Sequence, residues 1–406
     1  MTCQDTQPGL VNSTLQRSAS ASGIPHPLGV TSAVYAAACD RAGVRGGAAG
    51  AVERYRDLYR EGRVDAPHLF PPAGVIPPRI TRRLESESVE GPVRKFVLAL
   101  EGTASPGSLP VLNRADPGAV LETESVIIPM IGRKGHLTHT LCVSSQVGCA
   151  MGCVFCQTAQ MGLLRNLTAR EIVQQWFVAR HGIGGEGGCG TIRNIVFMGM
   201  GEPMDNLENV LAAIDVLTDH NGANMPMNKI TISTVGRVDG IERLAAQVRR
   251  PGWHRLNLAI SVNAPNDEVR SGIMPVNRKY PMSVLRGALE AWPIYGAAKL
   301  CLEYVLIPGV NDAPAHAGEV GDFVLGRGEY AGRPALPGLV NVIPYNPREG
   351  SPWPAPEETR VDDFLAWLLN AGVYAKRRRT KGRDQMAACG QLGNLELRRK
   401  KAGAAR

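Results

Sequence analysis

Residues 149–156 read Cys-Ala-Met-Gly-Cys-Val-Phe-Cys, a C-x3-C-x2-C spacing that directly follows a strand-like run at 137–143. Three thiolates on one short loop can bind three irons of a four-iron cube. The fourth iron then has no protein ligand, as catalytic metal sites keep a vacant position. The loop therefore predicts a [4Fe–4S] cluster held by Cys149, Cys153 and Cys156. A structural zinc would need a fourth ligand, which Cys142 or a distant His could provide. The sequence has no second CxxC pair that would complete a zinc ribbon.

Short apolar runs alternate with helix-length segments around this loop. The strand-like runs lie at 137–143, 194–198, 229–233, 256–262, 301–307 and 339–343. A helix is predicted from residue 168, because Thr168 and Glu171 can form a capping box. Strands that alternate with helices in this way favour an α/β protein with a parallel sheet.

The rest of the chain predicts four regions. Residues 1–30 are rich in Ser, Thr, Gly and Pro and predict a flexible leader. An N-terminal accessory domain is placed at 31–105. It contains an Ala-rich, helix-like stretch from 31 to about 62 and a predicted strand at 94–100. The barrel core is placed at 106–372 and a C-terminal segment at 373–406.

Composition excludes several classes of protein. With 406 residues and 44% hydrophobic content, the chain can bury a large core. No run approaches the roughly 18 apolar residues of a membrane helix, and the polar start lacks a secretory signal, so a cytoplasmic location is expected. Nine cysteines, an odd number, favour metal or redox chemistry over a disulfide framework.

The formal charge of +8 is carried partly in two clusters, at 376–383 and 398–401, which could face a polyanion. The alternative is a solvated surface and a frayed tail.

Polar residues and glycines stand at or near the ends of the predicted strands. In an α/β barrel ligands bind at the carboxyl ends of the strands. Glycines there let the backbone approach a ligand closely, and a carboxylate can accept hydrogen bonds from an amino group. These residues predict a cofactor pocket: Gly201, Glu202, Ser233, Ser261, Asn263 and Asn346.

The cysteine loop, including Phe155, resembles the signature of the radical S-adenosylmethionine superfamily. Further segments resemble the RlmN/Cfr family of RNA adenine methyltransferases: Cys142-Val-Ser-Ser-Gln-Val-Gly-Cys149, Arg165-Asn-Leu-Thr168, Gly199-Met-Gly-Glu-Pro203, Ser233-Thr-Val-Gly236, Ala264-Pro-Asn-Asp267 and Ala387-Ala-Cys-Gly-Gln-Leu392. The likeness runs from about residue 94 to residue 392. It implies a partial (β/α)6 barrel with a small helical N-terminal domain that contacts RNA and a C-terminal segment with a catalytic cysteine.

The resemblance also implies roles for individual residues. Cys389 would carry the methyl group, Cys142 would form a disulfide with it, and Glu124 would accept a proton. S-adenosylmethionine, two molecules per turnover, would contact Gly201, Glu202, Ser233, Ser261, Val262, Asn263 and Asn346. The substrate would be an adenine ring carbon, C2 first, of 23S ribosomal RNA and also of transfer RNA. Flavodoxin or ferredoxin would donate electrons to a monomeric enzyme.

Departures from the family concern the substrate more than the chemistry. Ser261-Val262-Asn263 stands where the family usually has Ser-Leu-His, and the N-terminal region matches poorly. Two enzymatic alternatives stay open. One is methylation at C8, and the other is a radical S-adenosylmethionine enzyme that acts on another substrate without a methyl relay. An RNA-binding protein with a structural metal centre is the non-enzymatic alternative.

Overall fold

The fold is built on a ten-stranded sheet with the order β1-β2-β3-β4-β7-β8-β9-β10-β11-β12. It is seen in a computed structural model that describes residues 23–64, 79–100, 120–132, 135–182, 189, 191–296, 300–348, 350–378 and 390–394.

Six central strands run parallel, each beside the next. They are β4 (Leu137–Cys142), β7 (Ile192–Phe197), β8 (Ile230–Thr234), β9 (Asn257–Ser261), β10 (Leu300–Leu306) and β11 (Gly338–Pro344). Every strand predicted between residues 137 and 343 is confirmed to within two residues at its start. Because the strands are parallel, their carboxyl ends meet at one edge of the sheet. The partial (β/α)6 barrel is confirmed.

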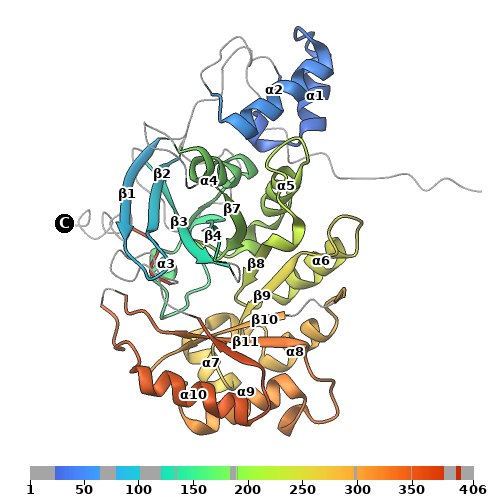
Figure 1. The fold of residues 1–406 in the computed structure, drawn as a ribbon. Helices are drawn as coiled ribbons and strands as arrows, with labels where there is room; N and C mark the ends of the chain where they lie inside the picture. The colour runs from blue at the N-terminus through green and yellow to red at the C-terminus, as the bar shows by residue number, and fades with distance from the viewer. Residues whose placement is uncertain are drawn as a thin grey trace, which may run out of the picture.

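Helices lie along the outer side of this curved sheet (Figure 1). They are α4 (Ala169–His181), α5 (Leu207–Thr218), α6 (Val238–Val248), α7 (Asp267–Ile273), α8 (Met282–Glu290), α9 (Pro314–Leu325) and α10 (Glu358–Asn370). Short 3-10 turns are η1 (Pro27–Gly29), η2 (Pro203–Asn206), η3 (Met227–Lys229), η4 (Pro275–Arg278) and η5 (Gly328–Tyr330). The predicted capping box is confirmed, since Thr168 and Glu171 exchange both bonds at the start of α4.

Additional strands extend the sheet at both edges. β1 (Ile80–Ser86), β2 (Val93–Ala99) and β3 (Glu122–Ile131) form an antiparallel extension that joins β4, and β12 (Ala375–Arg377) pairs in parallel with β11. A separate hairpin of β5 (Gln146–Gly148) and β6 (Leu163–Asn166) brackets the cysteine loop and α3 (Gln157–Met161). The expected domain boundary near residue 105 lies outside the described residues, between the paired strands β2 and β3, so the division into domains stays a prediction.

The N-terminal helices α1 (Ser32–Arg41) and α2 (Gly47–Glu61) sit at one end of the molecule, above α4 and α5 (Figure 1). The hydroxyl of Ser32 donates to Asp219 after α5, 3.0 Å away, and so ties them to the barrel. The prediction of an unstructured leader up to residue 30 does not hold for residues 23–30. Leu28 is fully buried in η1, and Val30 O accepts from the Tyr55 hydroxyl at 2.9 Å.

Among the residues that the structure describes, no helix is both long and apolar enough to cross a membrane.

Candidate functional site

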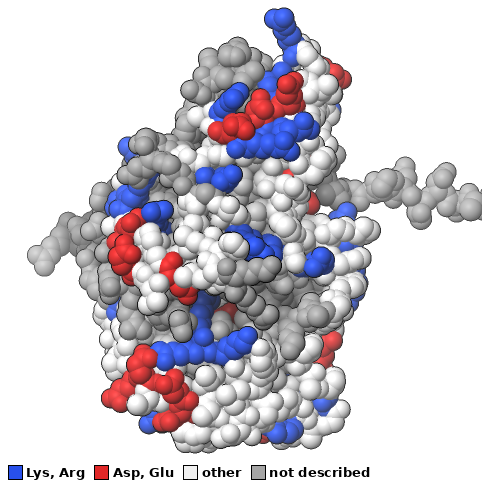
Figure 2. Space-filling model, in the orientation of Figure 1, with Lys and Arg blue, Asp and Glu red and all other residues white. Residues whose placement is uncertain are grey.

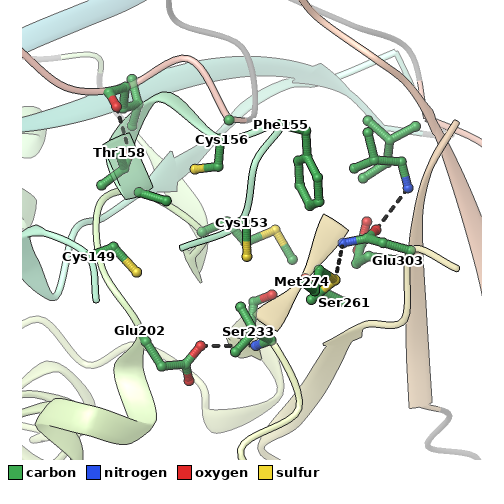
Figure 3. A pocket seen from close by; sticks show the side chains of 18 of the residues that line it. Cys149, Cys153, Phe155, Cys156, Thr158, Glu202, Ser233, Ser261, Met274 and Glu303 are labelled. Atoms are coloured by element: carbon green, nitrogen blue, oxygen red, sulfur yellow. Dashed lines mark hydrogen bonds between the residues drawn. The ribbon is translucent and has the colours of Figure 1, made fainter. Parts of the chain in front are cut away.

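A cavity of about 1040 Å³, measured to its open mouth, lies at the carboxyl ends of the parallel strands. Nine of the residues predicted from sequence line it: Cys149, Cys153, Cys156, Gly201, Glu202, Ser233, Ser261, Asn263 and Asn346. Figure 3 shows the three cysteines on one side of this cavity, with Glu202 and Ser233 facing them.

The cysteine loop is held from several directions. Cys149 N donates to Gly162 O at 3.0 Å, at the start of the hairpin strand β6. Val154 N donates to Ile273 O at 3.1 Å, and the guanidinium of Arg348 donates to Val154 O at the same distance. The loop is therefore fixed to the hairpin at its start and to the barrel at Val154.

The three thiols form a sulfur donor set suited to an iron–sulfur cluster. Cys149 and Cys153 are buried, and burial raises the pKa of both thiols. A bound metal centre would offset this cost, because it stabilises thiolates directly. Within the described ranges no three His, Cys, Asp or Glu side chains are arranged around a single ion. In a cluster each thiolate binds its own iron, so the cysteines need not converge on one point.

The turn after β7 requires its glycines. Gly201 has a φ of +103°, and a Cβ there would lie 2.6 Å from the Cβ of Gln146. Gln146 Oε1 in turn accepts from Glu202 N at 2.8 Å. Only glycine combines this conformation with such close packing, and the result places Glu202 at the cavity wall.

Glu202 is a buried carboxylate held by backbone donors. Its Oε1 accepts from Met204 N at 3.1 Å and its Oε2 from Val235 N at 2.9 Å. Burial raises the pKa of Glu202 to about 7, although these hydrogen bonds oppose the shift. A ligand ammonium beside it would favour the ionised form.

Asn263, which replaces the usual His, adopts a positive φ of 54° after β9. Asparagine tolerates this region better than most residues. Its Oδ1 accepts from Val305 N at 2.9 Å, and its backbone oxygen accepts from the amide of Asn311 at 2.8 Å. Val262 behaves differently. Its buried side chain is not part of the cavity lining and packs with Leu302 in the core.

Residues 390–394 dock against the start of α3, directly after the cysteine loop. Gln157 N donates to Gly390 O at 2.7 Å, and the buried hydroxyl of Thr158 donates to Leu392 O at 2.6 Å. Gly390 and Leu392 line the cavity. Cys389 itself lies outside the described residues, so its assigned role stays a prediction, but the segment that follows it forms part of the cavity wall.

Glu124 and Cys142 lie on the neighbouring strands β3 and β4, and Glu124 contacts this segment. The buried Glu124, on β3, pairs with Lys95 Nζ at 2.7 Å and accepts from Gly393 N at 3.2 Å. Cys142 ends β4, is buried, and lies opposite Val126 of β3. Neither side chain is among those that line the cavity.

Several cavity residues were missed by the sequence analysis. Glu303, from the middle of β10, is buried, accepts from Asn341 Nδ2 at 3.0 Å and lies 3.6 Å from Arg378. A charged residue inside the apolar run Leu-Cys-Leu-Glu-Tyr-Val-Leu was the signal for it. Phe155, Thr158 and Met274 also line the cavity.

On the face drawn in Figure 2, the described basic residues are mixed with acidic ones. Figure 2 shows Lys and Arg interspersed with Asp and Glu, most clearly over the N-terminal helices. Of the basic clusters, only residues 376–378 are described, and Arg377 there pairs with Glu358 and with Asp362. The role of these clusters toward a polyanion stays a prediction.

Comparisons with known proteins agree with this geometry. Residues 143–317 match the Radical SAM superfamily. The chain is 44% identical over 281 residues to a probable dual-specificity RNA methyltransferase RlmN 1 of Protochlamydia amoebophila, covering 69% of this chain and 72% of that protein. It is 42% identical to the dual-specificity RNA methyltransferase RlmN of Phenylobacterium zucineum over 69% of each chain.

A crystal structure of a radical SAM methyltransferase from Sphaerobacter thermophilus superposes with a TM-score of 0.73. It is 33% identical, and the match covers 90% of this chain and 98% of that one. The superposition therefore covers most of the chain. The similarity to the RlmN/Cfr family that the motifs indicate is confirmed. The chain therefore belongs to the RlmN family of radical SAM methyltransferases.

Proposed function

We propose that this enzyme methylates a ring carbon of adenine, with C2 as the leading position. The substrates are 23S ribosomal RNA and also transfer RNA, and S-adenosylmethionine is the methyl source. The relatives' names, dual-specificity RNA methyltransferase, support an RNA substrate. The observation that carries the proposal is the docking of residues 390–394. Directly after Cys389, this segment contacts both Glu124 and the helix α3 that follows the cysteine loop.

The cavity residues match the needs of the cofactor. Cys149, Cys153 and Cys156 would hold the [4Fe–4S] cluster, which when bound supplies the electron for cleaving S-adenosylmethionine. Glu202 would accept from the cofactor's amino group, because its carboxylate faces the cavity. The other predicted contacts line the same cavity except Val262, whose contact would be made by its backbone.

Three residues would carry the methyl transfer. Cys389 would take a methyl group on its sulfur. The radical chemistry that the cluster and a second S-adenosylmethionine supply would remove one hydrogen atom from this methyl group, so that its carbon can bond to the adenine ring. The ring would then lose one electron, which returns to the cluster, and one proton, which Glu124 would accept. The Cys142 thiolate would attack the Cys389 sulfur, so that an S–S bond forms, the C–S bond breaks and the released carbon takes up a proton as the new methyl group. A reductant must regenerate both thiols before the next cycle.

Nucleoside mass spectrometry of cellular RNA tests this function. Ribosomal and transfer RNA from cells without the gene should lack one methyladenosine that cells with the gene contain. Chromatography against 2-methyl and 8-methyl standards separates C2 from C8 products. Complementation with Cys389→Ala should not restore the signal. Unchanged methyladenosine in both RNA classes would overturn the proposal. A flavodoxin or ferredoxin donor, a monomeric state and a cytoplasmic location remain predictions.

A further inference from the structure

Arg270, on α7, is a fully buried cation with only neutral hydrogen-bond acceptors. Its Nε donates to Val262 O at 3.0 Å, and Nη1 donates to Asn277 Oδ1 at 2.9 Å. Nη2 donates to Val235 O at 2.6 Å and to Ser261 O at 3.2 Å. Every nitrogen of the guanidinium is thus used, yet a buried charge is costly unless an opposite charge lies near it.

These bonds join the ends of two neighbouring strands. Val235 directly follows the end of β8, and Ser261 is the last residue of β9. Both residues line the cavity. The backbone also leaves room for the guanidinium, because a Cβ on Gly236 would lie 3.0 Å from Nη2. One rigid, planar side chain therefore sets the spacing of the two strand ends that form the cavity wall.

The same helix contacts the cysteine loop. The last residue of α7, Ile273, accepts the hydrogen bond from Val154 N, between Cys153 and Cys156. Arg270 stands three residues before Ile273 on this short helix, so its buried charge lies on the element that holds the cysteine loop.

A second buried arginine shows what is unusual about Arg270. Arg286, on α8, is equally buried, but it forms an ion pair with Glu290 one turn later. The one carboxylate that acts on Arg270 by its charge is Asp267, whose Oδ1 is already bound by Asn277 Nδ2 at 2.8 Å. Among the residues that the structure describes, no carboxylate forms an ion pair with Arg270. The fold pairs Arg286 with a carboxylate and gives Arg270 only neutral hydrogen-bond acceptors.

We propose that Arg270 is a positioning residue with two roles, an inference that rests on the proposed cluster site. Its guanidinium fork holds the ends of β8 and β9 at the spacing that S-adenosylmethionine requires. Its charge stabilises the negative charge of the three thiolates and of the cluster when it gains an electron. Net charge near an iron–sulfur cluster is one of the factors that set its reduction potential.

Two substitutions separate these roles, with Arg286→Met as the matched control. Arg270→Met removes the charge and the fork, whereas Arg270→Lys keeps the charge and loses the fork. Each protein, with the wild type, is reconstituted anaerobically and assayed for iron and sulfide. Cluster reduction is then followed by electron paramagnetic resonance during a potential titration. Binding of S-adenosylmethionine to the reconstituted proteins is measured by calorimetry.

We expect Arg270→Met to lower the ratio of reduced to oxidised cluster about tenfold at a fixed potential, a shift of about 59 mV for one electron. Arg270→Lys should keep the wild-type potential but bind S-adenosylmethionine at least tenfold more weakly. Arg286→Met should match the wild type in both readouts. An Arg270→Met protein that fails to load its cluster, while Arg270→Lys and Arg286→Met load fully, also supports the charge role.

Three results would overturn the inference or its premise. If Arg270→Met that has loaded its cluster shows the reduction potential of the wild type, the charge role is wrong. Wild-type affinity for S-adenosylmethionine in Arg270→Lys removes the positioning role. If neither methionine variant loads a cluster, the reduction potential of Arg270→Lys decides the charge role. This variant keeps the charge, so a reduction potential that differs from that of the wild type would contradict the charge role. A wild-type protein that binds no iron overturns the cluster site itself and is recognised before any variant is compared.

Discussion

The carboxylate of Glu124 on β3 accepts a hydrogen bond, 3.2 Å long, from the backbone N–H of Gly393, 269 positions further along the chain. The same Oε2 lies 2.7 Å from Lys95 Nζ, and both side chains are buried. A group assigned as a proton acceptor is therefore also the anchor of the segment that follows Cys389.

Glu124→Gln should lower both stability and methylation. It leaves Lys95 as a buried charge without its carboxylate, which costs about 3–5 kcal/mol in comparable pairs. Loss of a general base lowers the rate by about 10²–10⁴-fold. Melting curves and single-turnover methylation measure the two effects. Lys95→Met/Glu124→Gln is the control: it should recover much of the lost stability but none of the lost rate. Recovery of the rate would contradict a role for Glu124 in proton transfer.

Thr158→Val should loosen the C-terminal segment without unfolding the barrel. The buried hydroxyl of Thr158 donates to Leu392 O, and an acceptor left without a partner costs about 1–3 kcal/mol. Hydrogen exchange should rise in the peptide that contains residues 390–394. Thr218→Val is the control, because that hydroxyl bonds only within and beside its own helix, α5. Equal protection in the Thr158 variant and the wild type would argue against this anchor.

Gly201→Ala should abolish cofactor binding. The substitution adds a positive-φ penalty of about 1–2 kcal/mol and a Cβ that would lie 2.6 Å from the Cβ of Gln146. Gly309→Ala is the matched control, since Gly309 also has a positive φ, +71°, but open space around its Cβ. Calorimetric binding of S-adenosylmethionine should be lost in the first variant and kept in the second. Comparable binding by both would show that the close packing is unimportant.

Stability of the cofactor-free protein should depend on Glu202 as the pH rises. The folded protein raises the pKa of Glu202 from 4.5 to about 7, so folding favours its protonated form. The benefit is complete below the unfolded pKa and is lost as the pH rises through about 7. Between pH 4.5 and 8 the wild type should therefore lose about 3 kcal/mol relative to Glu202→Gln. Urea unfolding at several pH values measures this, and parallel profiles would refute it.

The parallel strands were predictable because each contains buried apolar residues and appears as a short apolar run between turns. β1 was not, since its sequence Ile-Thr-Arg-Arg-Leu-Glu-Ser is polar and half-exposed, and its pairing with β2 is a tertiary feature. The polar residues at strand ends were found because parallel topology gathers them. Arg270 could not be found this way. Its helix segment, Asp-Glu-Val-Arg-Ser-Gly-Ile, resembles a solvated turn, and only packing shows that the arginine is buried.

The N-terminal correction has a similar cause. Leu28 stands alone in a stretch rich in Gly, Ser and Pro, so no periodicity marks it. It is buried because α4 and α5 pack against η1, and the hydroxyl of Tyr59 on α2 donates to Pro27 O. Composition predicts the absence of local order, but it cannot predict that a distant surface orders the segment.

The methyl relay through Cys389 is the central claim, and it requires a covalent protein–RNA intermediate that the Cys142 thiol resolves. Cys142→Ala, purified from cells and digested with ribonuclease, should retain a nucleotide on the peptide that contains Cys389. Intact-protein and peptide mass spectrometry measure it, with Cys142→Ala/Cys389→Ala as the control. The account predicts an added nucleotide mass in the single variant and none in the double. An unmodified Cys389 peptide in a cluster-loaded Cys142→Ala protein would contradict it.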